Sequence, residues 1–318
     1  MGGYESTLAP APSPGLQFMP ILGGRLTGLN MGGNQSTPPP PPSLVYDKAW
    51  REVDWTQRDT MIQDLRQLDL NDPDMGQLRI LLMGQIGAGK SSFVNSIKSA
   101  FSGRIVTTAL VDADTGTSFT KKYKTHYIKD GKGRFPFAFN DVMGLEPDES
   151  RGVHTDDIVS ILGGHVREGY EFNPTCPLTQ EKPDYNSSPE LKHRVHCLVG
   201  VVSANALFGM SDGLKCKLKT IREKASSLEI PQFLVMTKVD DACPEVKRDL
   251  RNIYKSKAIK KQMETCSNEL GIPMNCILPV KNYHEETKTN NEADALVLEA
   301  ITQIVGAAND YIWTLQQE

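Results

Sequence analysis

Short, uninterrupted apolar runs alternate along this chain with segments in which apolar residues recur every three or four positions. Such runs are typical of strands that are buried on both faces of a sheet, and the spaced segments are typical of amphipathic helices. The runs that we interpret as strands comprise residues 78–84, 134–141, 194–202, 232–238 and 275–280. Strands that alternate with helices predict an α/β fold around a mostly parallel open sheet.

Helical periodicity fills most of the remaining chain. Phe93, Ile97 and Phe101, for example, repeat every four residues directly after the first strand. The segments interpreted as helices comprise residues 50–70, 93–101, 155–166, 214–228, 246–253 and 298–315. The Lys/Arg-rich stretch from Lys247 to Lys261 is interpreted as one solvated helix face. Helices between parallel strands cover both faces of the sheet, which predicts a three-layer domain.

Two segments depart from this alternation. Residues 119–128 and 134–141 flank the turn signal Asp130-Gly131, which predicts an antiparallel hairpin at one edge of the sheet. Residues 172–190 are rich in Pro, Asn and Ser, and they follow the helix expected at 155–166. A long segment without secondary structure in a compact domain is usually functional or disordered.

The first 46 residues form a different kind of segment, rich in Pro, Gly, Ser and Thr and poor in charge. We expect a disordered low-complexity tail at 1–46, a helical lead-in at 47–75 and the α/β domain at 76–318. The run Pro38–Pro42 favours polyproline II, so a proline-recognition domain is one partner hypothesis. Met1-Gly2 with Ser6 also fits a pattern for N-myristoylation.

Composition narrows the class of protein. The net charge of −4 and the isoelectric point near 5.9 argue against a nucleic-acid-binding surface over the whole molecule. Six cysteines include no C-x-x-C pair, so reduced structural thiols are expected. The apolar runs are too short to cross a bilayer, and the N-terminus lacks the order of a secretory signal. These features predict a cytoplasmic protein without a transmembrane segment.

Residues Gly84 to Ser91 match the phosphate-loop pattern G-x-x-x-x-G-K-[ST] between a predicted strand and a predicted helix. In this context backbone N–H groups cradle phosphates, the lysine reaches the β- and γ-phosphates, and the serine hydroxyl ligates Mg²⁺. The residues expected to contact the phosphates or the metal here are Gly84, Gly87, Ala88, Gly89, Lys90, Ser91 and Ser92. A P-loop GTPase-like domain is therefore the expected fold, although this loop alone does not separate ATP from GTP.

Thr237-Lys238-Val239-Asp240 follows the strand at 232–238 and indicates which base is bound. A carboxylate at Asp240 can accept both the N1 and N2 hydrogens of guanine, which adenine cannot offer, while the stem of Lys238 covers the base. Thr237 can hydrogen-bond to the phosphate loop. Lys281 and Asn282, after the last strand, are expected to frame the base. These residues predict GTP or GDP as the ligand.

Asp141-Val142-Met143-Gly144 has the Asp-x-x-Gly arrangement that senses a γ-phosphate and its metal. Asp141 is a candidate for a water-mediated contact with Mg²⁺, which the hydroxyl of Ser91 is expected to ligate directly. Gly144 is a candidate for a backbone N–H to the γ-phosphate. A threonine should also cover the metal, and Thr117 is favoured over Thr115 and Thr120 because it directly precedes the hairpin. The next residue is Leu145, where small GTPases place a water-positioning glutamine.

Taken in order, these blocks resemble the interferon-induced protein 44 and 44-like family. The resemblance extends from about Asp47 to the end of the chain. It is carried by "WREVDW", "GQIGAGKSSFVNSIKSAF", "DVMGLE", "DDIVSILGGHV", "LVMTKVDD" and "GIPMNCILPVKNY". It implies a domain that binds guanine nucleotide, a cytoplasmic location, induction by interferon and a part in antiviral or immune regulation. Longer members have an additional N-terminal domain, and this chain has the proline-rich segment in that place.

Three classes of function are compatible with the nucleotide motifs. The first is a GTP-dependent switch or slow GTPase, the second a nucleotide-binding scaffold without hydrolysis, and the third an ATP-using enzyme, against which Asp240 argues. His154 and His165 lie downstream of Gly144 and can enter the site, although such histidines are more often structural. A second copy of the chain can supply a catalytic group in trans, so a homodimer across the nucleotide face is a further hypothesis.

Overall fold

The computed structural model describes residues 43–72, 74–109, 121–148, 150–206 and 209–317. Contacts between residues divide the chain into two units, Met1–Pro42 and Ser43–Glu318. The predicted tail therefore lies outside the described residues up to Pro42. Residues 43–46, which the sequence assigns to the tail, are described and belong to the second unit, within which the amide of Tyr46 donates to the carbonyl of Lys255.

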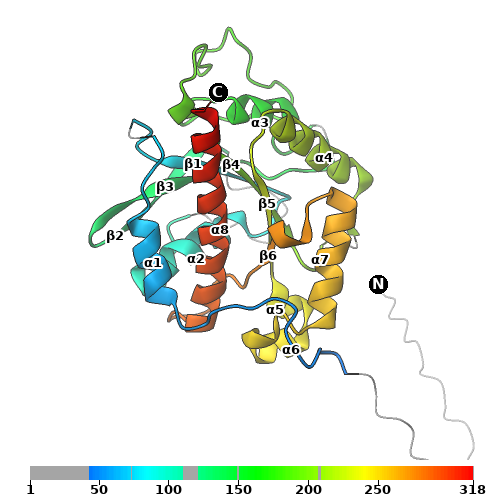
Figure 1. Ribbon diagram of the computed structural model, residues 1–318. Helices are drawn as coiled ribbons and strands as arrows, with labels where there is room; N and C mark the ends of the chain where they lie inside the picture. The colour runs from blue at the N-terminus through cyan, green and yellow to red at the C-terminus, as the bar shows by residue number, and fades with distance from the viewer. Residues whose placement is uncertain (1–42, 73, 110–120, 149, 207–208, 318) are drawn as a thin grey trace, which may run out of the picture. The chain divides into compact units, whose positions relative to one another are not determined.

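A six-stranded sheet forms the middle layer (Figure 1), in the order β2-β3-β1-β4-β5-β6. Its strands are β1 (Leu78–Met83), β2 (Lys124–Asp130), β3 (Gly133–Asp141), β4 (Cys197–Ser203), β5 (Gln232–Thr237) and β6 (Ile277–Pro279). Every neighbouring pair is parallel except β2 with β3, which form the predicted antiparallel hairpin. The chain places β3 on one side of β1 and β4 on the other. Such a reversal of strand order opens a crevice at the carboxyl ends of the strands.

Helices cover both faces of the sheet. One apolar cluster joins the sheet to α1 (Arg58–Arg66), α2 (Lys90–Ser102) and α8 (Asn291–Leu315). A second cluster on the other face joins it to α3 (Thr155–Leu162), α4 (Asp212–Ser227) and α7 (Lys257–Leu270). The predicted three-layer α/β architecture with one antiparallel edge hairpin is therefore confirmed. Because α1 packs in the first cluster, the helical lead-in and the sheet share one core.

The remaining elements are short. They are the helices α5 (Val239–Ala242) and α6 (Pro244–Arg248) and the 3₁₀ turns η1 (Leu191–His193), η3 (Leu250–Asn252) and η4 (Met274–Cys276). The interpretation of Lys247 to Lys261 as one helix face is wrong, because this stretch comprises the end of α6, η3 and the start of α7. Ser256 ends the irregular part, since its hydroxyl caps α7 by accepting from the amide of Ile259.

Residues 170–178 show that the long segment after α3 is packed rather than structureless. Tyr170, Phe172 and Leu178 are buried in the second apolar cluster. Their anchor is the fully buried Asp157 of α3, whose carboxylate accepts from the amide of Leu178 at 2.7 Å and from the hydroxyl of Tyr170 at 3.3 Å. Burial raises the pKa of the Asp157 carboxyl, although these donors favour its charged form. The segment therefore has its own buried polar link to the domain.

Candidate functional site

The phosphate loop connects β1 to α2 with a backbone that requires glycine. A Cβ at Gly84 would lie 2.1 Å from the carbonyl oxygen of Val201 in β4, so only glycine fits between the two strands. Gly89 has φ +95° and caps α2 in the left-handed region, which other residues rarely adopt. The first amide groups of α2 have no partners within their own helix, and they lie at the mouth of this loop. The loop therefore has the shape of an anion cradle.

Lys90 and Ser91 begin α2 and are both buried. The ammonium of Lys90 lies inside the loop and donates to the carbonyls of Gly84 at 3.1 Å and Gln85 at 3.2 Å. The hydroxyl of Ser91 donates to Oδ2 of Asp141 at 3.3 Å, across from the end of β3. The structure thus brings together the predicted phosphate lysine and two of the three predicted metal residues.

Two side chains from distant parts of the chain hold the other side of the loop. Thr237, at the end of β5, donates its hydroxyl to the carbonyl of Ala88 at 2.6 Å. Asn282, after β6, donates to the carbonyl of Gly89 at 3.2 Å. Its Oδ1 is buried without a hydrogen-bond partner among the described residues. The predicted contact of Thr237 with the phosphate loop is therefore present, and a buried acceptor of Asn282 remains available for a donor.

Asp240 lies in an ion cluster at the same corner. The ammonium of Lys281 is 3.6 Å from Oδ2 of Asp240 and also pairs with Glu286. Burial lowers the pKa of Lys281, but the two carboxylates outweigh burial and the net pKa lies above its ordinary value. Burial raises the pKa of Glu286, whereas the amide of His284 and the ammonium of Lys281 lower it to about 2. Glu286 thus holds Lys281 beside Asp240, and no motif in the sequence pointed to it.

Lys238 completes this corner through its backbone. It has φ +56°, one of two positive φ values among the described residues other than glycine. This left-handed residue turns the chain from β5 into the four-residue helix α5. The turn places Asp240 on the first turn of that helix rather than along the direction of the strand. Such strained backbone is frequent where side chains must be aimed at a ligand.

Leu145 is held in a way that the sequence did not indicate. Its amide donates to the carbonyl of Gly84 at 2.9 Å, so the chain after Asp141 runs beside the phosphate loop as a short strand extension. The Leu145 side chain is fully buried in the second apolar cluster. Gly144 is packed equally tightly, because a Cβ there would lie 2.5 Å from the side chain of Ile86. The leucine therefore serves packing and points away from the loop.

His126 is a site neighbour that no motif predicted. It is buried on β2, and its Nε2 is 3.8 Å from Oδ2 of Asp141. Its Nδ1 faces the ammonium of Lys98 in α2 at 3.4 Å. Since an ammonium can only donate, Nδ1 is the acceptor and Nε2 carries the proton that faces Asp141. Only the position of His126 in the hairpin indicated that it would lie near Asp141. His126 pairs with Phe139 of β3, and Phe139 precedes Asp141 by two residues.

The other predicted residues fall into three groups. Thr117 lies outside the described residues, as do its alternatives Thr115 and Thr120. Ser92 is half-buried in the first turn of α2. Two histidines have structural contacts: His154 caps α3 through the amide of Asp156, and His165 stacks on the ring of Tyr185 at 5.0 Å.

The chemistry of the donors fits a nucleotide with a divalent cation. The loop offers backbone N–H groups and a buried ammonium, which suit phosphates. Ser91 and Asp141 offer oxygens, which Mg²⁺ prefers, and Mg²⁺ normally keeps several waters and phosphate oxygens as its other ligands. No group of three or more His, Cys, Asp or Glu side chains suited to a metal occurs in the described part of the chain. Such a cage is not required for Mg²⁺ on a phosphate.

Known proteins resemble this chain in sequence. Interferon-induced protein 44-like from Homo sapiens is 35% identical over 264 residues, which is 82% of this chain and 58% of that protein. Interferon-induced protein 44 from Mus musculus is 37% identical over 254 residues, which is 79% of this chain and 60% of that protein. This chain thus spans about three fifths of the length of these relatives. No protein-family model matches it.

Solved structures resemble the fold at low identity. Toc33 from Arabidopsis thaliana, in complex with GDP and Mg²⁺, is 16% identical with a TM-score of 0.46, covering 81% of this chain and 97% of its own. A probable GTP-binding protein engB is 13% identical with a TM-score of 0.40, covering 72% of this chain and 98% of its own.

Within the described residues, no helix is both long enough and apolar enough to span a membrane.

Proposed function

We propose that the protein binds a guanine nucleotide with Mg²⁺. The aligned part of this chain belongs to the interferon-induced protein 44 and 44-like family. The observation that carries this proposal is the meeting of Thr237, Asn282 and the phosphate loop at one corner of the sheet. The names of the relatives support a part in the interferon response as the wider role. A cytoplasmic location belongs to the same proposal. Residues 76–318 are the proposed nucleotide-binding domain, preceded by the lead-in at 47–75.

Each residue of this corner has a proposed part in binding. The amides of residues 87–92 and the ammonium of Lys90 hold the phosphates. Asp240 accepts from the guanine base, and the stem of Lys238 covers its plane. Glu286 supports this role indirectly, because it provides Lys281 with a second carboxylate when Asp240 engages the base.

Ser91 and Asp141 are the proposed residues for Mg²⁺, the first through its hydroxyl and the second through a water. The metal neutralises phosphate charge when bound. The 3.3 Å contact between the two side chains supports the assignment, because it keeps both oxygens at one point beside the loop. Their burial also limits the competition from bulk water.

Slow hydrolysis is the expected activity of this site. Leu145 is buried, and a leucine can neither donate to nor accept from a water, so this position cannot orient a nucleophile. The intrinsic rate should be on the order of 10⁻⁴ s⁻¹ or below, as in unassisted switch GTPases. The second candidate function, a nucleotide-binding scaffold without hydrolysis, is favoured by the same burial of Leu145.

The test is to release and identify the nucleotide that co-purifies with the full chain, and to time its turnover with and without Mg²⁺. We expect GDP or GTP in the parent protein and an empty Lys90→Ala variant, because the substitution removes a charge inside the phosphate loop. A purified protein that holds adenine nucleotide, or a Lys90→Ala variant that retains guanine nucleotide like the parent, would contradict the proposal.

Single-turnover measurements then separate the two candidate functions. Slow cleavage of bound GTP supports a switch or slow GTPase, and GTP that stays intact over days supports a scaffold. Cleavage that accelerates with protein concentration would indicate that a second copy supplies a catalytic group. A rate near 1 s⁻¹ in the monomer would contradict both, because it requires a water-positioning residue that Leu145 does not provide.

A further inference from the structure

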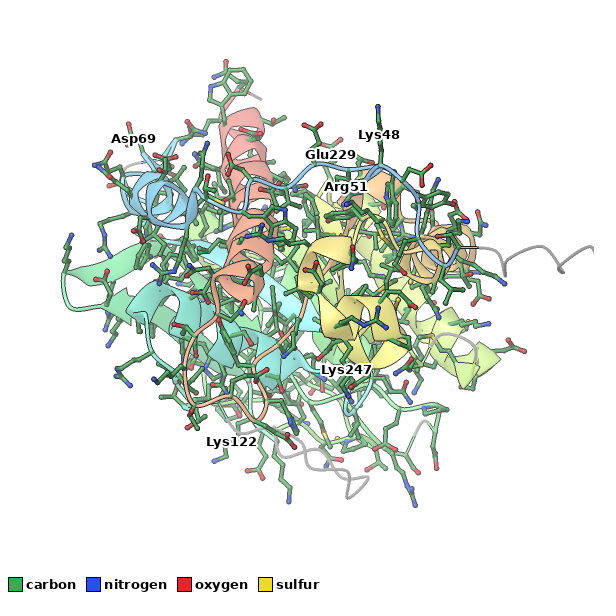
Figure 2. All side chains as sticks on the ribbon, turned by 90° about the horizontal axis from the view of Figure 1, so that it is seen from below. Lys48, Arg51, Asp69, Lys122, Glu229 and Lys247 are labelled. Atoms are coloured by element: carbon green, nitrogen blue, oxygen red, sulfur yellow. The ribbon has the colours of Figure 1, made fainter. Side chains whose placement is uncertain are left out.

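A basic and aromatic surface lies outside the nucleotide motifs, where residues 43–57 cross the start of α7. We call residues 43–57 the strap. Residues 247–261 beneath it contain seven Lys or Arg and one Asp, in a chain whose net charge is −4. The strap patch is the surface formed by Leu44, Tyr46, Lys48, Arg251, Lys255, Lys257, Lys260 and Lys261. Figure 2 shows Lys48 projecting away from the strap into solvent.

Backbone hydrogen bonds fix the strap on this basic segment. Val45 forms a bridge with Ser256, and the amide of Lys257 donates to the carbonyl of Leu44. The amide of Trp50 donates to the carbonyl of Tyr254 at 3.0 Å. The apolar side chains of the strap and the cations of α7 therefore form one ordered surface.

Cations stand over the aromatic rings of this surface. The ammonium groups of Lys257 and Lys260 are 5.4 and 5.3 Å from the ring centre of Tyr46. Lys260 is also 5.8 Å from the ring of Trp50, which meets Tyr46 edge to face. Cation–π contacts of this kind hold the charges next to apolar area rather than apart from it. The ammonium groups therefore occupy space over these rings.

Exposed apolar side chains lie among these cations. Leu44 is 63% exposed and Tyr46 is 37% exposed, and both are among the few large apolar side chains that the described residues leave in contact with water. Contact with the phosphate backbone of a nucleic acid does not stabilise an aliphatic side chain. Insertion at the boundary between lipid head groups and acyl chains does, because it removes apolar area from water. Apolar residues surrounded by Lys and Arg are the pattern of a surface that lies on an anionic membrane.

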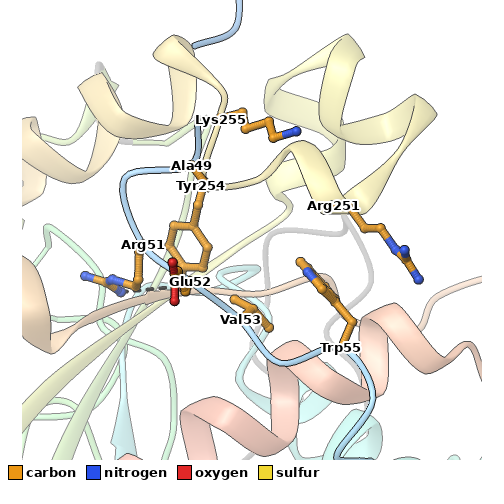
Figure 3. A pocket seen from close by; sticks show the side chains of 8 residues that line it. All are labelled: Ala49, Arg51, Glu52, Val53, Trp55, Arg251, Tyr254 and Lys255. Carbon is orange, nitrogen blue, oxygen red and sulfur yellow. Dashed lines mark hydrogen bonds between the residues drawn. The ribbon is translucent and has the colours of Figure 1, made fainter. Parts of the chain in front are cut away.

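A cavity of about 390 Å³ opens beside the patch (Figure 3). Trp55 and Tyr254 provide its apolar walls, Lys255 and Arg251 its cations, and Glu52 one opposing charge. Arg251 also pairs with Glu292 at 3.2 Å. Arg51 is committed elsewhere, since its guanidinium donates to the carbonyls of Met274 at 2.7 Å and Ile277 at 2.9 Å. The free part of the cavity therefore suits a small anionic group with an apolar continuation, such as the phosphate head of a lipid.

We propose that the strap patch docks the protein on the surface of an anionic phospholipid membrane. Leu44 enters the interface, and the cations of α7 attract the head groups. The cavity between Trp55 and Tyr254 accommodates a phosphate head. This inference goes beyond the proposed function and is independent of it, because none of these residues contacts the phosphate loop.

Sedimentation of the full chain with vesicles tests the proposal. We expect binding to vesicles of phosphatidylcholine with about 30% phosphatidylserine, and no binding to phosphatidylcholine alone. The Lys260→Glu/Lys261→Glu variant should bind at least about tenfold more weakly, because each cation near an anionic surface raises the membrane affinity about fivefold. The matched control Lys219→Glu/Lys224→Glu makes the same charge change on exposed positions of α4 and should bind like the parent.

Leu44→Ser tests the apolar part separately, and its exposed position should leave the fold intact. It should weaken binding severalfold at both low and high salt, whereas the charge variant should matter mainly at low salt. Equal loss in the α4 control, or binding that Leu44→Ser leaves unchanged, would overturn the proposal. Binding to a single-stranded oligonucleotide with the same variant dependence, without vesicle binding, would replace the membrane by a nucleic acid.

Discussion

Leu145 is the residue at which backbone and side chain have different roles. Its amide ties the Asp-x-x-Gly segment to the carbonyl of Gly84, whereas its side chain belongs to the apolar core. A polar group at this position would therefore be buried without a partner. The residue contributes to positioning Asp141 and Gly144, and not to orienting a water.

We therefore predict that Leu145→Gln lowers the free energy of unfolding by about 2 to 3 kcal/mol and does not accelerate GTP cleavage. Denaturant unfolding and single-turnover cleavage measure the two effects. Leu145→Met is the control, since a swap that conserves volume should cost less than about 1.5 kcal/mol. A Gln variant of parental stability that cleaves GTP faster would show that the side chain faces the nucleotide after all.

Residue patterns in the sequence could predict part of the site, because they reflect local backbone requirements. The phosphate loop needs glycine at Gly84 and Gly89 whatever the rest of the fold does, so its pattern is visible in one segment. His126 could not be predicted, because only the tertiary fold brings it near Asp141. Glu286 lies close to Lys281 in the sequence, but only the fold shows that this pair stands beside Asp240. The orientation of Leu145 likewise depends on the cluster around α3.

At the scale of elements, His196 joins the starts of β1 and β4. Its Nδ1 accepts from the amide of Arg79 at 2.9 Å, and its Nε2 donates to the carbonyl of Leu191 at 3.0 Å. Both partners suit the neutral ring, because a proton on Nδ1 would face an N–H group. Burial, opposed by the Leu191 carbonyl, lowers the pKa of His196 from 6.5 to about 4.

This arrangement predicts an acid-sensitive stability. Because the unfolded chain binds the proton more tightly, the contribution of His196 is present above pH 6.5 and is lost as the pH falls to about 4. The loss amounts to roughly 3 kcal/mol, and it should level off below that pH. When urea unfolding is measured between pH 7 and pH 4, the free energy of unfolding should fall less steeply with decreasing pH for His196→Asn than for the parent. His284→Asn, at an exposed position, should keep the parental pH dependence. A His196→Asn variant with the parental pH dependence of stability would contradict this prediction.

A buried ion pair connects α1 to α8. The guanidinium of Arg58 donates to Oδ2 of Asp294 at 2.9 Å, and the side chain of Asp294 is only 1% exposed. The hydroxyl of Tyr283 donates to the other carboxylate oxygen at 2.6 Å. Tyr283 directly follows Asn282, so this network links the lead-in helix to the corner that carries the proposed base contacts.

Removing the cation should leave a buried carboxylate with only one strong donor. We predict that Arg58→Met lowers the free energy of unfolding by about 2 to 4 kcal/mol, measured by denaturant unfolding. Asp59→Ala provides the matched control, because Asp59 also pairs with Arg58 but is 92% exposed, and it should cost less than about 1 kcal/mol. Equal costs for the two variants would mean that the Asp294 pair contributes no more than a surface pair.

The elements themselves were predictable where their patterns are regular. Doubly buried strands and most of the helices between them have local signatures, and these elements agree with the structure. The helix expected at 246–253 is instead the end of α6 followed by η3. The prediction for Lys247 to Lys261 was wrong because the charges of this stretch suggested one continuous solvated helix. Instead, the backbone of the strap forms hydrogen bonds with the backbone of Lys255 and Lys257. A contact between residues so far apart in the chain leaves no periodic signal.

The whole molecule combines two surfaces of different charge chemistry. The corner proposed to bind the nucleotide carries Asp141, Asp240 and Glu286, and the strap patch concentrates cations at the start of α7. The proposed function requires that this corner selects guanine over adenine.

Calorimetric titration of the nucleotide-free full chain with GDP, ADP and XDP, in the presence of Mg²⁺, measures that selection directly. We predict binding of GDP and none of ADP. For Asp240→Asn we predict a loss of GDP affinity on the order of a hundredfold and a gain of XDP affinity, because the amide offers a donor where guanine N1–H needs an acceptor. Asp241→Asn, at the exposed neighbouring position, should bind like the parent. Equal affinity for GDP and ADP, or an Asp240→Asn variant that keeps parental GDP affinity, would contradict the account.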